Sequence, residues 1–150
     1  MKYIFSTLVI MLLTVTLGLA RWAFIPLEQL VQESDLIVIG ALTDVKEHTE
    51  NEIEHGRGVI TVDKVLWGNV KAGEKLNLTW ENAVGIVCPR IDHKDNQQKK
   101  AIWLLTVEKN NGVKADYPGR FVELTQKEEI LKLIKQNKAV VSKNISLFKL

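Results

Sequence analysis

Short apolar stretches separated by turn residues dominate the middle of this chain and restrict it to a mainly β fold. Between residues 36 and 124, no amphipathic helical pattern interrupts them. A succession of short strands of this kind is typical of β-sandwiches and β-barrels. The predicted strands are LIVIGALTDV (36–45), VITVDKVLWG (59–68), KLNLTW (75–80), AIWLLTVE (101–108) and VKADY (113–117).

The connections between these strands carry signals of their own. Gly40 lies inside the first apolar run, where a missing side chain permits a bulge or a sharp bend. The polar, acidic segment 46–58 is interpreted as a loop between the first two strands. The sequence KNNG at 109–112 predicts a hairpin turn, because asparagine and glycine tolerate positive φ angles. Residues 113–117 are therefore expected to return antiparallel to the strand before them.

Helices are predicted near the two ends of the domain. FIPLEQLVQE indicates a short helix over residues 27–33, with proline before its first turn. TQKEEILKLIKQ indicates a second helix, in which Thr125 and Glu128 form a capping box. Its core-facing apolar stripe consists of Ile130, Leu131 and Ile134. The tail AVVSKNISLFKL (139–150) is interpreted as a further edge strand.

The amino terminus has the pattern of a secretory signal peptide. Lys2 supplies a basic start, residues 3–20 carry no charge, and the run ends in the small-x-small sequence Gly-Leu-Ala. We expect cleavage after Ala20, leaving one secreted or periplasmic domain (21–150) without a stable membrane span. An uncleaved anchor is the alternative, because an apolar run of this length can just cross a bilayer.

Charge and cysteine content exclude several classes of protein. The chain has 20 basic and 18 acidic residues, which are intermixed rather than clustered. Nucleic acid is therefore not an expected partner, since phosphate binding needs a concentrated positive face. Cys88 is the only cysteine, so no internal disulfide can form and an apolar core must stabilise the domain. We expect a monomer, with a Cys88-linked dimer as the alternative.

The strand pattern with a helix near each end predicts a five-stranded antiparallel barrel, closed or partly open. Barrels of this size are characteristic of the oligonucleotide/oligosaccharide-binding type, the OB-fold. A β-sandwich is the alternative architecture.

Three motifs add a resemblance to a known family. They are Ser34-Asp35 before the first strand, Val65-Leu66-Trp67-Gly68, and Trp103-Leu104-Leu105. Over residues 27–124 the chain resembles the netrin-like domains, which include the tissue inhibitors of metalloproteinases, and more closely their secreted bacterial relatives. The resemblance implies an OB-fold barrel. It does not extend to the inhibitors' mechanism, which uses an amino-terminal cysteine to chelate zinc, because the predicted mature chain starts at Arg21.

The segment GIVCPRIDHKDN (85–96) concentrates candidate site residues. A thiolate and an imidazole are good ligands for zinc or copper, so Cys88, His93 and Asp92 form a candidate metal site. His48 or His55 from segment 46–58 would complete the site. In a second interpretation, His93 activates Cys88 as a nucleophile. In the structural interpretation, Cys88 is a half-buried apolar residue at a strand end, followed by a solvated loop.

Two arginines and two aromatic residues form the predicted binding set: Arg90, Arg120, Tyr117 and Trp80. Each arginine follows a proline-containing turn, where its five donors suit a carboxylate or a phosphate. Trp80 and Tyr117 are candidate stacking platforms. The structural alternatives are pairing of the arginines with Asp92 or Asp116, and core packing of the aromatic rings.

These observations favour a binding or interaction module without evident catalysis or a required cofactor. Its partner would be a protein or small molecule in the cell envelope or outside the cell, bound by segments 46–58, 85–100 and 117–121. One alternative is a metal or thiol protein that uses Cys88 and His93. The other is a structural envelope protein whose partner binds an exposed strand edge.

Overall fold

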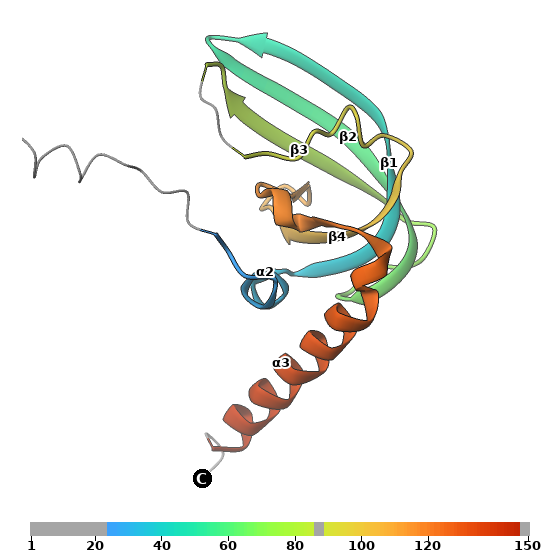
Figure 1. Cartoon of the computed structure of the whole chain (residues 1–150), viewed down its shortest axis with the longest axis vertical. Helices are drawn as coiled ribbons and strands as arrows, with labels where there is room; N and C mark the ends of the chain where they lie inside the picture. Colours follow the sequence, from blue (N-terminus) through green and yellow to red (C-terminus); the bar gives the residue numbers. More distant parts are fainter. Residues whose placement is uncertain (1–23, 86–88, 148–150) are drawn as a thin grey trace, which may run out of the picture.

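The computed structural model describes residues 24–85 and 89–147, with side chains as far as Asn137 (Figure 1). The proposed signal segment and Cys88 lie outside the described residues. The chain is mainly β, as predicted. Its elements are α2 (Leu27–Glu33), β1 (Leu36–Glu50), β2 (Ile53–Trp67), β3 (Lys75–Ala83), β4 (Lys100–Val107), β5 (Val113–Lys114), η1 (Pro118–Arg120), β6 (Phe121–Val122), η2 (Leu124–Gln126) and α3 (Lys127–Leu147).

The strands form one sheet in the order β1-β2-β3-β5-β4-β6, and β1 also pairs with β4. These pairings close a ring of five strands, β1 to β5. A ring with an odd number of strands cannot alternate direction throughout, so one of its pairings must be parallel. That pairing joins β3 to β5 at Leu78 and Val113. The prediction of five antiparallel strands is therefore corrected to six strands in a mixed sheet.

Strand β1 belongs to two pairings at once, and Gly40 lets it bend between them. Gly40 pairs with Val62 of β2 and with Ala101 of β4, and the β1–β2 register shifts immediately before it. A Cβ atom at this position would overlap the backbone oxygen of Thr61. The indole Nε1–H of buried Trp103 donates to the Gly40 carbonyl at 3.2 Å. The prediction of a bulge or bend at this glycine is confirmed by the register shift.

The polar segment 46–58 is a β-hairpin, and the prediction of a loop there is wrong. β1 continues to Glu50, and β2 starts at Ile53. Between them, Asn51 and Glu52 have φ angles of 50° and 62°. Two successive positive φ angles give a tight turn whose twist matches that of the flanking strands, so the strands stay paired to their ends. Backbone pairing thus maintains a strand that its polar side chains do not indicate.

The sheet separates two apolar cores. The first lies inside the ring and is built from all five of its strands. The second lies between β1, β4 and the helices α2 and α3. Because β1 and β4 contribute alternate side chains to both cores, they read as almost continuously apolar runs. Fully buried residues of the two strands include Ile37, Val38, Leu42, Ile102, Trp103, Leu104 and Leu105.

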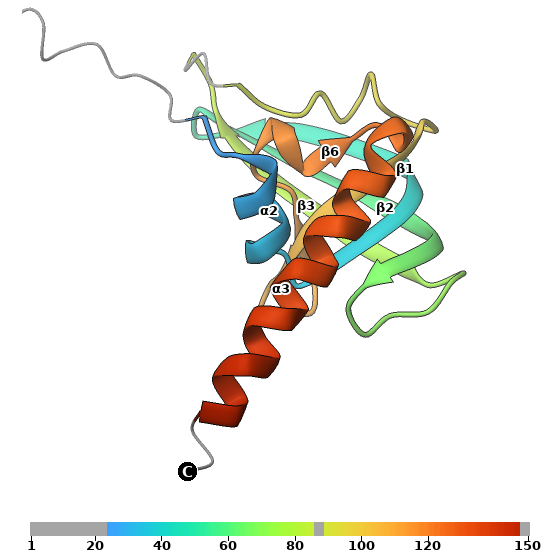
Figure 2. The ribbon, with the colours of Figure 1, turned by 60° about the horizontal axis from the view of Figure 1, so that its bottom comes forward.

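Helix α3 runs beside α2 and continues past it (Figure 2). Ile130 and Ile134 are buried in the second core as predicted, while Leu131 is half-buried. The predicted edge strand in the tail is wrong, because the helix extends to Leu147. The capping box is also wrong: Thr125 lies in the 3-10 turn η2 and donates its hydroxyl to Glu123. None of the helices in the described part of the chain combines the length and apolar character needed to cross a membrane.

We expect Gly40→Ala to destabilise the protein by roughly 1–3 kcal/mol, because the added methyl group forces β1 and β2 apart. Gly112→Ala is the matched control, since its Cβ would meet only movable side-chain atoms of Asn110 and Glu108. Urea unfolding followed by tryptophan fluorescence measures both variants. Equal losses in the two would contradict the role assigned to Gly40.

Candidate functional site

His93 is buried inside the ring, although the loop that carries it is mostly exposed. The histidine is 5% exposed, and its ring stacks on Trp80 with 3.9 Å between centroids and an interplanar angle of 15°. Trp103 lies on a nearly parallel plane, with 6.5 Å between its ring centroid and that of His93. Ile91 is buried in the same core. The described part of GIVCPRIDHKDN is therefore a cover over the first core.

Burial determines the protonation of His93. Desolvation lowers its pKa from 6.5 to about 4, with the carboxylate of Asp92 opposing the shift and Arg90 adding to it. The imidazole is thus neutral at pH 7. Its buried Nε2 atom finds no hydrogen-bond partner among the described residues, so within this part of the chain a polar atom lies uncompensated in an otherwise apolar stack.

Two of the three predicted metal ligands, Asp92 and His93, lie within the described residues. Asp92 is exposed, and its carboxylate accepts the backbone N–H of Asp95 at 2.9 Å, so it organises its own turn. Across residues 24–85 and 89–137, no three His, Cys, Asp or Glu side chains gather to hold a metal ion. Cys88 falls outside the described residues, and its grouping with His93 therefore stays a prediction.

Arg120 is a buried structural residue. Its Nε atom lies 3.0 Å from Asp116 as an ion pair without hydrogen-bond geometry, and a terminal nitrogen lies 3.5 Å from Glu33. It also donates to the Ser34 hydroxyl and the Leu104 carbonyl, at 3.3 and 3.5 Å. The guanidinium therefore ties η1 to the end of α2 and to β4. The alternative of structural pairing with Asp116 is confirmed.

The four predicted binding residues do not share a surface. Tyr117 lies near Arg120, and its hydroxyl accepts the backbone N–H of Ile25 at 3.2 Å. Exposed Arg90 instead forms an ion pair with Glu54 of the β1–β2 hairpin at 3.2 Å. Trp80 is 5% exposed and packs in the first core, which agrees with the structural alternative for this ring.

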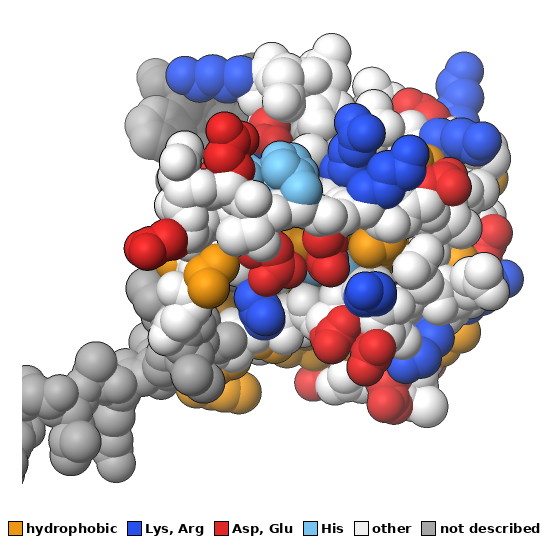
Figure 3. All heavy atoms as spheres, turned by 90° about the horizontal axis from the view of Figure 1, so that it is seen from above, with side chains coloured by type: hydrophobic (Ala, Val, Ile, Leu, Met, Phe, Trp, Pro, Cys, Tyr) orange, Lys and Arg blue, Asp and Glu red, His pale blue; other side chains and the backbone are white. Residues whose placement is uncertain are grey.

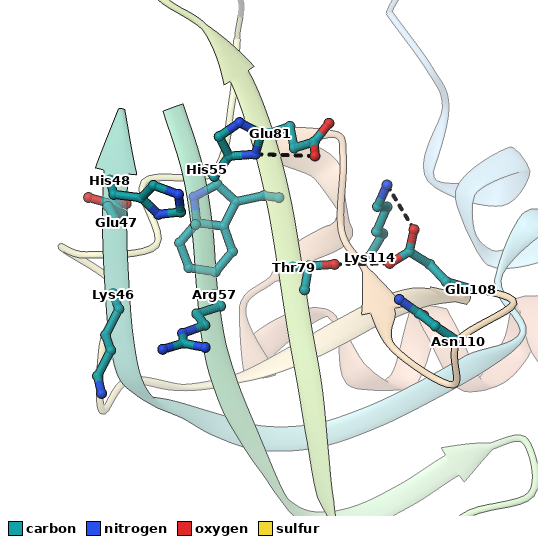
Figure 4. A pocket seen from close by; sticks show the side chains of 12 residues that line it. Lys46, Glu47, His48, His55, Arg57, Thr79, Glu81, Glu108, Asn110 and Lys114 are labelled. Carbon is teal, nitrogen blue, oxygen red and sulfur yellow. Dashed lines mark hydrogen bonds and ion pairs between the residues drawn. The ribbon is translucent and has the colours of Figure 1, made fainter. Parts of the chain in front are cut away.

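A groove of about 600 Å³ lies elsewhere, over β1, β2 and β3 and beside the β4–β5 turn (Figure 4). We call it the β1–β3 groove. It is lined by Lys46, Glu47, His48, His55, Gly56, Arg57, Thr79, Trp80, Glu81, Glu108, Asn110 and Lys114. Of the predicted binding residues, only Trp80 lines it. Seen from the hairpin end of the molecule, basic and acidic side chains are intermixed around an exposed histidine (Figure 3).

Strand register places the groove side chains in two cross-strand rows. Lys46 pairs with Arg57, which pairs with Thr79. In the second row His48 pairs with His55, which pairs with Glu81. Residues in such rows lie on one face of a sheet.

A bulge in β1 sets this alignment. Asp44 has a φ of 56°, and the register shifts between Thr43 and Lys46. The extra residue allows Lys46 to oppose Arg57 on the groove face, because a slip of one residue moves a side chain to the other face.

Direct contacts organise part of the groove. The rings of His48 and His55 stack with 5.3 Å between centroids, and His55 Nδ1 lies 3.3 Å from Glu81. Glu108 accepts the Thr79 hydroxyl at 2.9 Å and binds the Lys114 ammonium at 2.8 Å. The hydrogen bond from Lys114, with that from Thr79, lowers the pKa of Glu108, and the hydrogen bond to Glu108 raises the pKa of Lys114.

Sequence reasoning placed segment 46–58 on the binding surface but treated it as a loop, so it did not predict the cross-strand rows that form the groove. The signal was present in the spacing: Lys46 and His48 are two apart, as are His55 and Arg57, on either side of an Asn-Glu turn. In a paired hairpin, this spacing places all four side chains on one face. No family model matches the chain, and no curated protein shows significant similarity to it. Function is therefore inferred from the geometry of the groove.

Arg120→Ala is expected to destabilise the protein by roughly 1–3 kcal/mol, because it leaves buried Ser34 and Leu104 oxygens without their donor. Arg90→Ala should change stability by less than about 1 kcal/mol, since its ion pair is exposed. Urea unfolding of both variants measures the difference. Similar small changes in both would show that Arg120 does not hold η1 in place.

His93 should make stability depend on pH. Its folded pKa of about 4 lies below the unfolded value of 6.5, so the unfolded chain binds more protons between these values. This titration therefore does not affect the free energy of unfolding above pH 6.5. As the pH falls towards 4, the free energy of unfolding decreases by up to about 3 kcal/mol. His93→Phe, which keeps a ring in the stack, should reduce this loss, whereas His48→Phe on the exposed hairpin should not. Urea unfolding of both variants from pH 7 to pH 4 measures the slopes, and identical slopes would contradict the assignment.

Proposed function

We propose that this protein is a secreted or periplasmic binding module and that the β1–β3 groove is its ligand site. The observation that supports this proposal is the groove itself. It is open to solvent, and its walls consist of paired strands and of side chains joined in ion pairs. Its volume of about 600 Å³ falls within the range of small-molecule sites. Because its side chains project from strands, their positions are set by backbone register and change little when a ligand binds.

We further propose that the ring of strands is an OB-fold barrel of the netrin-like type. The closed set of pairings among β1 to β5 supports this assignment. OB-fold proteins bind ligands on the face of strands 2 and 3 and on the loops joining strands 1 to 2 and 4 to 5. The groove has the same placement, since Arg57 and Thr79 come from β2 and β3, and Asn110 comes from the β4–β5 turn.

The groove favours a small ligand or a short segment of a partner over a reaction. Its two histidines stack on each other, and the carboxylates Glu81 and Glu108 are paired with His55 and Lys114. A general base needs a nucleophile or a substrate proton within reach. No serine or cysteine lines the groove among the described residues, and the hydroxyl of Thr79 donates to Glu108, a carboxylate that Lys114 already holds in an ion pair. The groove geometry thus supports recognition.

Native and denaturing intact mass spectrometry of protein recovered from the secreted or periplasmic fraction tests the proposal. We expect a small-molecule adduct that is lost on denaturation. Thr79→Tyr should abolish it, because the phenol ring fills the groove. Asn77→Tyr is the matched control, on the same strand and face but outside the groove.

Two results would contradict the groove as the ligand site. One is an adduct that persists equally in Thr79→Tyr and Asn77→Tyr. The other is recovered protein that carries no adduct and gains none from the concentrated fraction. A zinc or copper adduct lost in Cys88→Ser would favour the metal alternative instead.

A further inference from the structure

Two cations in the groove, Lys46 and Arg57, lack an acidic partner within the described residues. They are directly opposed in the β1–β2 register, and both are exposed. Their side chains extend to the same end of the groove, away from the His55–Glu81 pair (Figure 4). Like charges directly opposite each other destabilise a sheet. The hairpin therefore keeps two positive charges together without a folding benefit.

The other charged side chains that line the groove are already in ion pairs or point away from Lys46 and Arg57. Glu81 pairs with His55, and Glu108 pairs with Lys114. The remaining carboxylate, Glu47, pairs in register with Gly56, one position along from Lys46 and Arg57. Successive side chains of a strand point to opposite faces, so Glu47 does not project beside these two cations. The side chains at this end of the groove therefore carry a net positive charge.

We propose that Lys46 and Arg57 form an oxyanion subsite of the β1–β3 groove, which holds the carboxylate, phosphate or sulfate group of its ligand. This inference rests on the proposed function. The planar guanidinium of Arg57 can donate to two oxygens of one group, and the ammonium of Lys46 adds a point charge beside it. An anion bound between them removes the repulsion that the free hairpin carries.

The subsite suits one anionic group and not a polyanion. Binding a nucleic acid requires several cations along a stripe. Here Glu81 and Glu108 lie in the same groove and repel a chain of phosphates. The stacked imidazoles of His48 and His55 occupy the next cross-strand row and provide a flat surface for the uncharged part of the ligand.

Nuclear magnetic resonance titration of the chain as recovered from its cells tests the subsite. The probes are inorganic phosphate, sulfate and succinate at constant ionic strength, with glucose as the neutral control. We expect at least one oxyanion to shift the backbone amide signals of the 46–57 hairpin saturably, and glucose to leave them unchanged. The probe with the highest affinity identifies which oxyanion the subsite prefers.

Three variants make the assignment specific. Lys46→Gln and Arg57→Gln should each weaken binding of the preferred oxyanion by about tenfold or more, as expected for loss of a charge-assisted hydrogen bond. Lys64→Gln is the matched control, because Lys64 is an exposed lysine of β2 outside the groove. Without added anion and at low salt, Lys46→Gln and Arg57→Gln should also raise the midpoint of thermal unfolding, and Lys64→Gln should not.

The subsite is overturned if no oxyanion gives saturable shifts, or if Lys64→Gln weakens binding as much as Arg57→Gln. It is also overturned if single-stranded oligonucleotide binds the groove more tightly than all three small anions. When Thr79→Tyr still abolishes the native adduct in these cases, the groove remains the ligand site and only the subsite fails. When the adduct survives Thr79→Tyr as well, both proposals fail.

Discussion

The fold depends on β1 bonding along both of its edges near Gly40. One edge meets β2 and the other meets β4, and only a residue without a side chain fits between them so close to the Thr61 carbonyl. The indole N–H of Trp103 satisfies the carbonyl of this glycine from inside the ring. The bend therefore closes the ring and positions a tryptophan against His93 at the same time.

The far half of β1 has a different role from the half that holds the ring together. Beyond Ala41, β1 no longer pairs with β4, and its only strand partner in the described chain is β2. Leu42 and Val45 still pack in the first core, but from Lys46 onward the hairpin is polar and contributes little to either core. Freed from packing requirements, this part of the sheet can carry opposed cations and stacked histidines. The core strands could not accommodate them, because buried charge without a partner is strongly destabilising.

Sequence patterns predicted the fold better than the site. The helix over 27–33, the strands around the three tryptophan-containing runs and the bend at Gly40 follow from apolar periodicity and local sterics. The hairpin at 46–58 does not, since backbone pairing maintains strands whose side chains are polar. The extension of α3 to Leu147 does not either, because the β-branched residues after position 138 favour a strand by propensity, whereas the chain continues the preceding helix. His93 and Arg120 were chosen for their chemistry, but burial determines what they do, and no local sequence rule reports burial of a polar residue.

The short strand β5 determines where the ring of strands can open transiently. It joins β3 through a single register pair and β4 through two, so the ring is thinnest there. Regions held by few backbone bonds open first, and their amides exchange with solvent well before those of the core. Transient opening at β5 would release Lys114 and Glu108 together from one wall of the groove, while β1 and β2 stay paired. Entry of the proposed ligand would then depend on local opening at β5.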